Sequence, residues 1–401
     1  MKTGRLTDYF LKVAWKALSQ VEVGDSVQYH QHEFNGVAAL RDMFGTEKQK
    51  FPAKFLFFDD EVNDAANGFM TWYDARENHP TRTEFRFYFS GSFITEHSKV
   101  GNVLIMALRP DHTILVIVCA QEAAILPQLL WLFGISAIGD KFAIRDEAAT
   151  GQTSVGAAAR FILTQIGIEP EPKENDDGLL DAMLAHFHGG FPSTSVFSAF
   201  ARNTVKGDCR ADPDGILVLW MEREERLFKL LEQYLVEKRL EQGFVGENRV
   251  DDFVTYSLSV QNRRKSRAGA ALENHFEYLL QEWQIRNSRT PVTEGNSKPD
   301  FLFPGIEAYR DPAFPAFRLT MLGAKTTAKD RWRQILAEAD RIPEKHLLTL
   351  QVGISKPQLA EMATHHVVPV IPQAFRQTYA AGLQRGILTV ADFLRLVESR
   401  Q

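Results

Sequence analysis

The sequence feature that most constrains the fold is an acidic, proline-containing segment near the middle of the chain, GIEPEPKENDDG at residues 167–178. It contains no aromatic residue, and this composition is typical of an exposed linker between folded parts. A chain of 401 residues is also long for one hydrophobic core, because single cores stop growing at about 250 to 300 residues. We therefore expect two domains, residues 1–168 and 179–401, joined by a linker at 169–178.

The two halves differ in the pattern of their apolar residues. Between residues 21 and 122, short runs rich in Phe, Val and Thr alternate with Gly, Asn, Asp and Pro, which predicts a mainly β domain. The second half begins with a helical period over 269–283. It continues with the strand-like runs PDFLF and RLTMLGAKTT, a helical period in KDRWRQILAEADR, and further strands in HLLTLQVG and HVVPVIP. This alternation predicts an α/β domain with a mixed sheet.

Composition excludes several classes of protein. The first thirty residues lack the pattern of a signal peptide, and the longest apolar run, 123–139, is interrupted and too short to span a bilayer, so it predicts a buried helix. We expect a cytoplasmic protein without a membrane partner. The two cysteines, Cys119 and Cys209, fit a reducing compartment; either could be a nucleophile, although a structural role is favoured. The sequence has no nucleotide-binding G-x-x-x-x-G-K-[ST] motif, which argues against a nucleotide-driven motor.

Three charged residues of the second half have the spacing of a site that hydrolyses phosphodiesters. That reaction uses a divalent cation held by carboxylate oxygens, with a lysine nearby. Asp300 precedes the run FLF, and Lys325 follows the run RLTMLGA, so pairing of these strands would bring both side chains to one sheet edge. In the common PD-(D/E)xK arrangement a second carboxylate lies two residues before the lysine, but Gly323 occupies that position. We expect Glu338, on the following helix, to supply the carboxylate instead.

The helical period around Glu338 separates a packing face from a polar face. Glu338 shares the polar face with Arg331 and Gln334, and Thr326 or Thr327 is expected to cap the helix. The packing face consists of Trp332, Ile335, Leu336 and Ala339. One face can then meet the sheet while the other meets a substrate.

Basic clusters flank the expected site, although a net charge of −5 disfavours general binding to nucleic acid. One cluster, NRRKSR at 262–267, precedes the first expected helix of this half; the other, KDRWR at 329–333, begins the helix after Lys325. Each cluster, like each charged residue of the site, is also compatible with a solvated surface. Together they indicate a groove for phosphates, with arginine available for guanine edges. The first cluster contributes the candidate DNA-binding residues Arg263, Arg264, Lys265 and Arg267.

The blocks NRRKSRAGAALENHFEYLL, TEGNSKPDFLFP and KTTAKDRWRQILAEADRI closely resemble the catalytic half of the EcoRII restriction endonuclease family, over most of residues 250–355. The resemblance implies a PD-(D/E)xK restriction-endonuclease-like fold in which Asp300, Lys325 and Glu338 are catalytic and Asp300 and Glu338 hold Mg²⁺. It adds the supporting residues Glu273, Tyr309 and Lys329, and it places Lys329, Asp330 and Arg331 where related enzymes read C·G pairs.

The same resemblance implies a substrate and an assembly. Such enzymes act as homodimers on double-stranded DNA and cut CCWGG, where W is A or T, before the first C to leave 5′ overhangs. In close relatives the central base pair is flipped out of the stack, which costs a few kcal/mol of unstacking.

The run TRTEFRFYF in the first half has a strand period that separates two faces. Phe85, Phe87 and Phe89 form an apolar face, and Arg82, Glu84, Arg86 and Tyr88 form a polar face. The arginines could contact guanine and Glu84 could accept from cytosine, but a salt-bridged surface ladder is an equally good interpretation.

The first half also resembles the EcoRII family, more weakly, and there the family carries a DNA-binding effector domain with a pseudobarrel fold. The resemblance favours the DNA-reading interpretation of Arg82, Glu84 and Arg86. The segment HQHEFNGVAALRDMFG aligns with the other DNA-reading arm of the family and makes His30 and Asn35 contact candidates, although the family has Tyr where Asn35 lies.

The resemblance to the EcoRII family implies a type II (IIE) endonuclease whose N-terminal domain binds effector sites and otherwise inhibits cleavage. A catalytically silent DNA-binding regulator and a structure-specific repair nuclease are the alternatives. The intact Asp, Lys and Glu positions argue against the first alternative, and the retained KDRWR block argues against the second.

Overall fold

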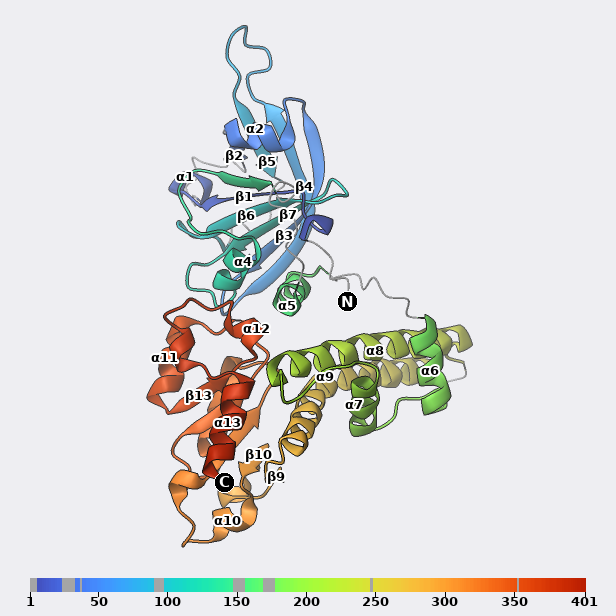
Figure 1. Ribbon diagram of the computed structural model, residues 1–401. Coiled ribbons are helices and arrows are strands. Elements are labelled where there is room, and N and C mark those ends of the chain that lie inside the picture. Colours follow the sequence, from blue (N-terminus) through green and yellow to red (C-terminus); the bar gives the residue numbers. More distant parts are fainter. Residues whose placement is uncertain are drawn as a thin grey trace. The chain divides into compact units, whose positions relative to one another are not determined.

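The computed structural model describes residues 6–23, 33–36, 38–89, 97–146, 156–168, 177–245, 248–351 and 353–401. The chain divides into two compact units, Met1–Lys173 and Glu174–Gln401 (Figure 1). The division falls inside the segment that the sequence suggests as a linker.

The N-terminal unit is built around a sheet of eight strands within the described residues, in the order β2-β5-β4-β3-β7-β6-β1-β8. Neighbouring strands are antiparallel except β3 and β7, which are parallel. The strands are β1 (Lys12–Ala17), β2 (Glu33–Asn35), β3 (Gln49–Phe58), β4 (Asn63–Asp74), β5 (Phe85–Phe89), β6 (Val103–Leu108), β7 (Ile114–Cys119) and β8 (Ala143–Asp146). The helices are η1 (Leu6–Asp8), α1 (Gln20–Val23), α2 (Ala38–Phe44), α4 (Leu126–Leu132) and α5 (Ala157–Gln165).

One apolar core contains side chains from both edges of this sheet. Phe34 in β2 contacts Phe142, which immediately precedes β8, with ring centroids 6.3 Å apart. Because β2 and β8 stand at opposite ends of the strand order, the sheet must curl so that its edges approach each other around the core. In β5 the alternate residues Phe85, Phe87 and Phe89 are buried, which confirms the expected apolar face. The mainly β architecture expected for this half is present.

The C-terminal unit begins with helices. These are α6 (Asp177–Phe187), α7 (Thr194–Asn203), α8 (Pro213–Gln242) and α9 (Arg249–Glu282), and α7, α8 and α9 pack against one another. The first helix expected here, 269–283, is only the last part of α9. The basic cluster 262–267 therefore lies inside α9, not before it. Residues 249–268 contain no Gly or Pro but are largely exposed, so they form helix without the apolar period that predicts one.

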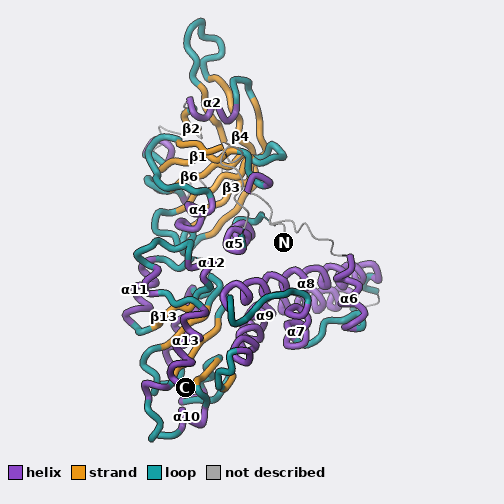
Figure 2. Tube along the Cα trace, in the orientation of Figure 1, coloured by secondary structure: helices purple, strands orange, loops and turns teal. Residues whose placement is uncertain are grey.

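A five-stranded mixed sheet follows, in the order β13-β12-β11-β10-β9 within the described residues. Strands β9, β10 and β11 are antiparallel, and β11, β12 and β13 are parallel, which confirms the expected α/β domain with a mixed sheet. Figure 2 shows these strands alternating with helices and loops. The strands are β9 (Ser288–Arg289), β10 (Phe301–Phe303), β11 (Thr320–Ala324), β12 (Lys345–Leu348) and β13 (Val367–Val370).

The remaining helices of this unit connect the strands or follow them. They are η2 (Glu294–Asn296), α10 (Ile306–Arg310), η3 (Ala316–Arg318), η4 (Lys329–Ala337), α11 (Lys356–Thr364), α12 (Gln373–Arg376), η5 (Gln384–Gly386) and α13 (Val390–Arg400). Among the described residues of both units, no helix combines the length and apolar character needed to cross a membrane.

Candidate active site

Asp300 and Lys325 meet at the end of the antiparallel pair β10 and β11. Asp300 immediately precedes β10, whose Phe301 lies opposite Leu322 of β11, and Lys325 immediately follows β11. The Asp300 carboxylate oxygen Oδ2 accepts hydrogen bonds from the Ala324 amide at 2.6 Å and from the Lys325 ammonium at 2.7 Å. Only 12% of the Asp300 side chain and 21% of the Lys325 side chain are exposed. The strand pairing predicted from the sequence therefore brings this acid and base together.

Gly323 explains why the second carboxylate does not lie two residues before the lysine. A Cβ atom at Gly323 would stand 2.7 Å from Cγ2 of Ile335 and 3.7 Å from Cδ1 of Leu347. The first distance is shorter than real side chains tolerate, so η4 packs directly on the backbone of β11. A carboxylate at position 323 is incompatible with this packing, and the same helix delivers Glu338 at its end.

The segment that carries Glu338 differs from its expected form. Residues 329–337 form a 3₁₀ helix, and Glu338 lies just after it with an extended backbone (φ −96°, ψ 139°). Ala328 stands at the N-cap, so the expected capping by Thr326 or Thr327 is wrong. The expected faces are present: Trp332, Ile335 and Ala339 are buried, Leu336 is half-buried, and Arg331 and Gln334 are exposed.

The Glu338 carboxyl lies in the electrostatic field of Asp300 and Lys325. Burial, and then the negative charge of Asp300, raise its pKa from 4.5 to about 7, while Lys325 and Lys345 oppose this rise. Its oxygen Oε2 is buried and has no hydrogen-bond partner among the described residues. A buried carboxylate oxygen without a donor is an available ligand for a cation.

Glu273 on α9 is electrostatically coupled to the same cluster. Burial and then the charge of Asp300 raise its pKa, and its hydrogen bond with Arg289 opposes the rise. Arg289 contacts Glu273 at 3.1 Å and Glu277 at 2.6 Å, so this arginine holds two carboxylates of α9 against β9.

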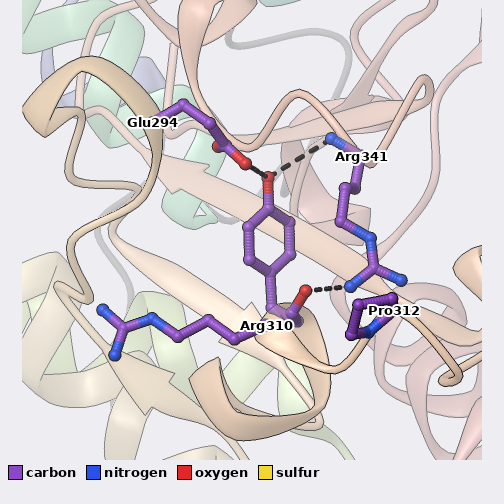
Figure 3. Close-up of a pocket in the computed structure, with 5 residues that line it drawn as sticks. Glu294, Arg310, Pro312 and Arg341 are labelled. Atoms are coloured by element: carbon purple, nitrogen blue, oxygen red, sulfur yellow. Dashed lines mark hydrogen bonds between the residues drawn. The ribbon is translucent and has the colours of Figure 1, made fainter.

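Tyr309 lies in a separate pocket of about 310 Å³, lined by Glu294, Tyr309, Arg310, Pro312 and Arg341 (Figure 3). Its hydroxyl donates to the Glu294 carboxylate, at 2.8 and 2.7 Å from the two oxygens, and accepts from the Arg341 amide at 3.2 Å. Burial and the Glu294 hydrogen bond raise the pKa of Tyr309 to about 12. None of these contacts involves Asp300, Lys325 or Glu338.

The first basic cluster is held against the rest of the helical layer. Arg264 forms an ion pair with Glu232 at 2.6 Å, and Arg263 lies 4.5 Å above the ring of Phe191. Arg267 is buried, pairs with Glu225 and lies 4.3 Å above the ring of Phe228. Lys265 is exposed.

In the second basic cluster Arg331 is exposed, and Arg333 pairs with Glu361 at 2.9 Å. The side chains of Lys329 and Asp330 lie outside the described residues.

In the N-terminal unit the polar face of β5 is part of an ion-pair network. Arg86 binds Glu33 of β2 and Glu84, each at 2.8 Å, and Glu84 also binds Arg76 at 2.5 Å. Tyr73 of β4 donates a hydrogen bond to Glu33. The salt-bridged ladder that the sequence left open is therefore present, and it includes Glu33, Tyr73 and Arg76, which the sequence analysis missed.

The remaining DNA-contact candidates of this unit are placed less fully. Asn35 pairs with Arg86 across β2 and β5, and Arg82 is exposed in the loop before β5. His30 lies outside the described residues. The strand alternation of TRTEFRFYF identified one side of the ion-pair network, but only the pairing of β2, β4 and β5 reveals the other side.

The C-terminal part of the chain is similar in sequence to known proteins. A family model described as EcoRII C terminal matches residues 228–394. The type II restriction enzyme EcoRII of Escherichia coli is 43% identical over 210 residues, which are 52% of this chain and 51% of that enzyme. The chain thus spans about half the length of the curated relative that it matches.

The structure was also compared with solved structures, and two of the matches are restriction endonucleases. Metal-depleted Ecl18kI in complex with uncleaved DNA has a TM-score of 0.45 and 19% identity, over 57% of this chain and 85% of that chain. The PspGI–substrate DNA complex has a TM-score of 0.39 and 14% identity, over 57% and 93%. The family model and the sequence identity thus agree that the C-terminal part of this chain is similar to the EcoRII restriction endonuclease, and the family model restricts this similarity to residues 228–394.

Proposed function

We propose that this chain is a type II site-specific endonuclease that hydrolyses phosphodiester bonds of double-stranded DNA. The observation that carries the proposal is the meeting of Asp300 and Lys325 at one sheet edge, with the half-buried carboxyl of Glu338 in the same electrostatic field. This set of an acid, a lysine and a second acid is what metal-assisted phosphodiester hydrolysis requires.

Asp300 and Glu338 are the residues that would hold Mg²⁺. Carboxylate oxygens are the ligands that Mg²⁺ prefers, and the buried, unpartnered Oε2 of Glu338 fits this role. No group of three or more Asp, Glu, His or Cys residues suited to a metal occurs among the described residues. Two carboxylates are nevertheless compatible with Mg²⁺, because this ion usually keeps several waters. When bound, it supplies Lewis-acid stabilisation of the phosphate under attack.

The side chains around this pair have separate tasks in the proposed mechanism. Lys325 places a positive charge beside Asp300, where it can stabilise the negative charge that develops on the phosphate. Asp300 also fixes the lysine, because one carboxylate oxygen accepts from both the Lys325 ammonium and the Ala324 amide. Glu273, Tyr309 and Lys329 are assigned supporting roles by their resemblance to the family.

We further propose that the target is CCWGG and that Lys329, Asp330 and Arg331 read its C·G pairs. The support is the resemblance of the KDRWR block to the recognition block of the family, together with the exposure of Arg331 near the start of η4. Arginine can donate two hydrogen bonds to guanine in the major groove, and aspartate can accept one from cytosine.

The N-terminal unit is proposed to be a pseudobarrel that binds effector copies of the site and inhibits cleavage until it does so. Its curled sheet and the charged ladder of Glu84, Arg86 and Glu33 support this assignment. A fragment from residue 179 onward should then cut single-site DNA faster than the full chain does. If the fragment cuts such DNA no better, inhibition by the N-terminal unit is refuted.

A homodimer is proposed as the active form. On α9, Val250, Val254 and Leu258 follow one another at four-residue intervals and are 66%, 47% and 52% exposed, so they form an apolar stripe on one helix face. A second copy packed antiparallel about Leu258 would bring the two Leu258 side chains together and the exposed Asp251 of each copy opposite the exposed Lys265 of the other. An apolar contact flanked by opposite charges favours self-association.

The test of the proposed function is cleavage of plasmids that carry zero, one or several CCWGG sites, with magnesium and with a chelator, followed by mapping of the cut ends. Magnesium-dependent cutting of the multi-site plasmid before the first C is the expected result. Specific binding without cutting would favour the silent regulator, and preferential cutting of branched DNA would favour a structure-specific nuclease.

A further inference from the structure

Lys345, at the start of β12, is a buried amine to which neither the sequence nor the proposed mechanism assigns a task. Only 6% of the residue is exposed. Its ammonium donates to the backbone carbonyl oxygens of Glu338 at 2.5 Å, Ala339 at 3.2 Å and Ile342 at 3.0 Å. A lysine ammonium has three donors and no acceptor, so all of its hydrogen-bonding capacity is used on one short backbone segment.

These three carbonyls belong to the turn that leads from η4 to β12. Ala339, directly after Glu338, has a φ of 52°, in the left-handed region that residues other than glycine rarely adopt. Such a conformation persists only where the surroundings hold it in place. The ammonium of Lys345 meets this need, because it draws the carbonyls on both sides of the turn to one point.

The same lysine is tied to the sheet that carries the other two site residues. Strand β12 is the parallel neighbour of β11, with His346 opposite Leu322, and Lys325 follows β11 directly. In the last turn of η4, three residues before Glu338, Ile335 packs on the backbone of Gly323. Glu338 is therefore fixed between two attachments to the strands that also determine where Asp300 and Lys325 lie.

We propose that Lys345 is a positioning residue that sets the Glu338 carboxylate at the correct place for a shared divalent cation with Asp300. This inference rests on the proposed function, because it takes Asp300 and Glu338 as the metal ligands. Lys345 itself touches neither metal nor DNA in this role; it acts by fixing the backbone on which Glu338 stands.

The alternative is that Lys345 contributes only to the stability of the unit, and Asp214 provides a matched control. Asp214 is also 6% exposed, and its carboxylate accepts from three backbone amides, those of Gln373 at 2.9 Å, Val390 at 2.8 Å and Ala391 at 2.9 Å. It lies at the start of α8, and none of these three hydrogen-bond partners is a residue of the site. Lys345→Met and Asp214→Leu each remove one buried charge that holds three backbone groups.

The experiment uses the full chain and measures Mn²⁺ binding by electron paramagnetic resonance without DNA, thermal unfolding, and the magnesium concentration that gives half-maximal cleavage. We expect Lys345→Met to weaken Mn²⁺ binding at least tenfold and to raise the magnesium requirement. Asp214→Leu should lower the unfolding temperature but leave Mn²⁺ binding unchanged. Lys345→Arg, which keeps the charge and the hydrogen-bond donors, should bind Mn²⁺ more tightly than Lys345→Met does. It is also the variant to measure if Lys345→Met does not fold.

Three results would overturn the proposal. One is unchanged Mn²⁺ binding in a folded Lys345→Met or in both Lys345 variants. Another is an equal loss of Mn²⁺ binding in Asp214→Leu. The third is a wild-type chain that binds no Mn²⁺ at this site, which Glu338→Gln would reveal by leaving the titration unchanged. That third result would remove the metal site itself, whereas the first two would remove only the role of Lys345.

Discussion

Replacement of Glu338 by glutamine should make the metal-free protein more stable at pH 8 while abolishing cleavage. In the folded chain, burial and the charge of Asp300 raise the pKa of this carboxyl from 4.5 to about 7. A carboxyl with a raised pKa destabilises the folded state progressively as the pH rises from the unfolded value through the folded value. The loss of stability therefore begins near pH 4.5 and is complete above pH 7. Glutamine carries no charge, so the Glu338→Gln variant does not lose this stability as the pH rises.

The size of the effect follows from the pKa. A rise in pKa of about 2.5 corresponds to about 3 kcal/mol of unfolding free energy, because a shift of one pKa unit corresponds to about 1.4 kcal/mol. Water that remains around the half-buried side chain reduces this, so we expect Glu338→Gln to gain about 2 to 3 kcal/mol of unfolding free energy at pH 8. At pH 5 the folded wild-type carboxyl is already mostly protonated, and the gain should fall below about 1 kcal/mol.

The assay is urea unfolding of the full chain in a chelator at pH 5 and pH 8. Hydrogen exchange of peptides from β11, η4 and β12 reports the C-terminal unit separately. Added magnesium should stabilise the wild-type chain at pH 8 but not Glu338→Gln. It should therefore narrow or reverse the difference in unfolding free energy between the two proteins. Equal stability of the two proteins at pH 8 in the chelator would refute the argument that Glu338 is a destabilised buried carboxylate.

Four further substitutions test other parts of the structure. Lys325→Ala should abolish cleavage and leave sequence-specific DNA binding intact in a gel-shift assay with Ca²⁺; retained cleavage would remove Lys325 from the mechanism. Gly323→Ala should lower the unfolding free energy, measured with urea, by about 1 to 3 kcal/mol, because the new Cβ meets Ile335. The same substitution should lower it by less in a chain that already carries Ile335→Ala. Arg86→Ala should weaken effector-DNA binding at least tenfold by fluorescence anisotropy, since it leaves Glu33 and Glu84 without their shared cation; unchanged affinity would make the ladder purely structural. Leu258→Asp should shift the chain towards monomer in sedimentation velocity, whereas Ser259→Asp, exposed on another face of α9, should not.

The sequence was sufficient for the parts of the site that depend on strand pairing. Runs of alternating or continuous apolar residues identified β10, β11, β12 and β13, and the side chains next to β10 and β11 followed from that pairing. The absence of a carboxylate at Gly323 was visible in the sequence, but its cause was not. Only the packing of Ile335 on the backbone of β11 shows that a side chain is excluded there.

The sequence failed where long-range contacts decide local structure. The helix η4 ends before Glu338, next to the turn at Ala339 and to the carbonyls that accept from Lys345, and neither of these features leaves a periodic signal in the sequence. The acidic residues that pair with the basic cluster of α9, such as Glu232 and Glu225, come from α8 and could not be predicted from the cluster itself. A charge pattern within one segment cannot reveal a partner on another.

The length of α9 has a mechanical consequence. The helix has 34 residues, bears Glu273 near one end and the exposed Val250, Val254 and Leu258 near the other. At about 1.5 Å per residue, Val254 and Glu273 are separated by roughly 28 Å of continuous helix. The stripe and Glu273 are therefore connected by helical backbone alone, with no loop between them. A partner that binds the stripe of Val250, Val254 and Leu258 can therefore shift Glu273, whose carboxyl lies in the electrostatic field of Asp300.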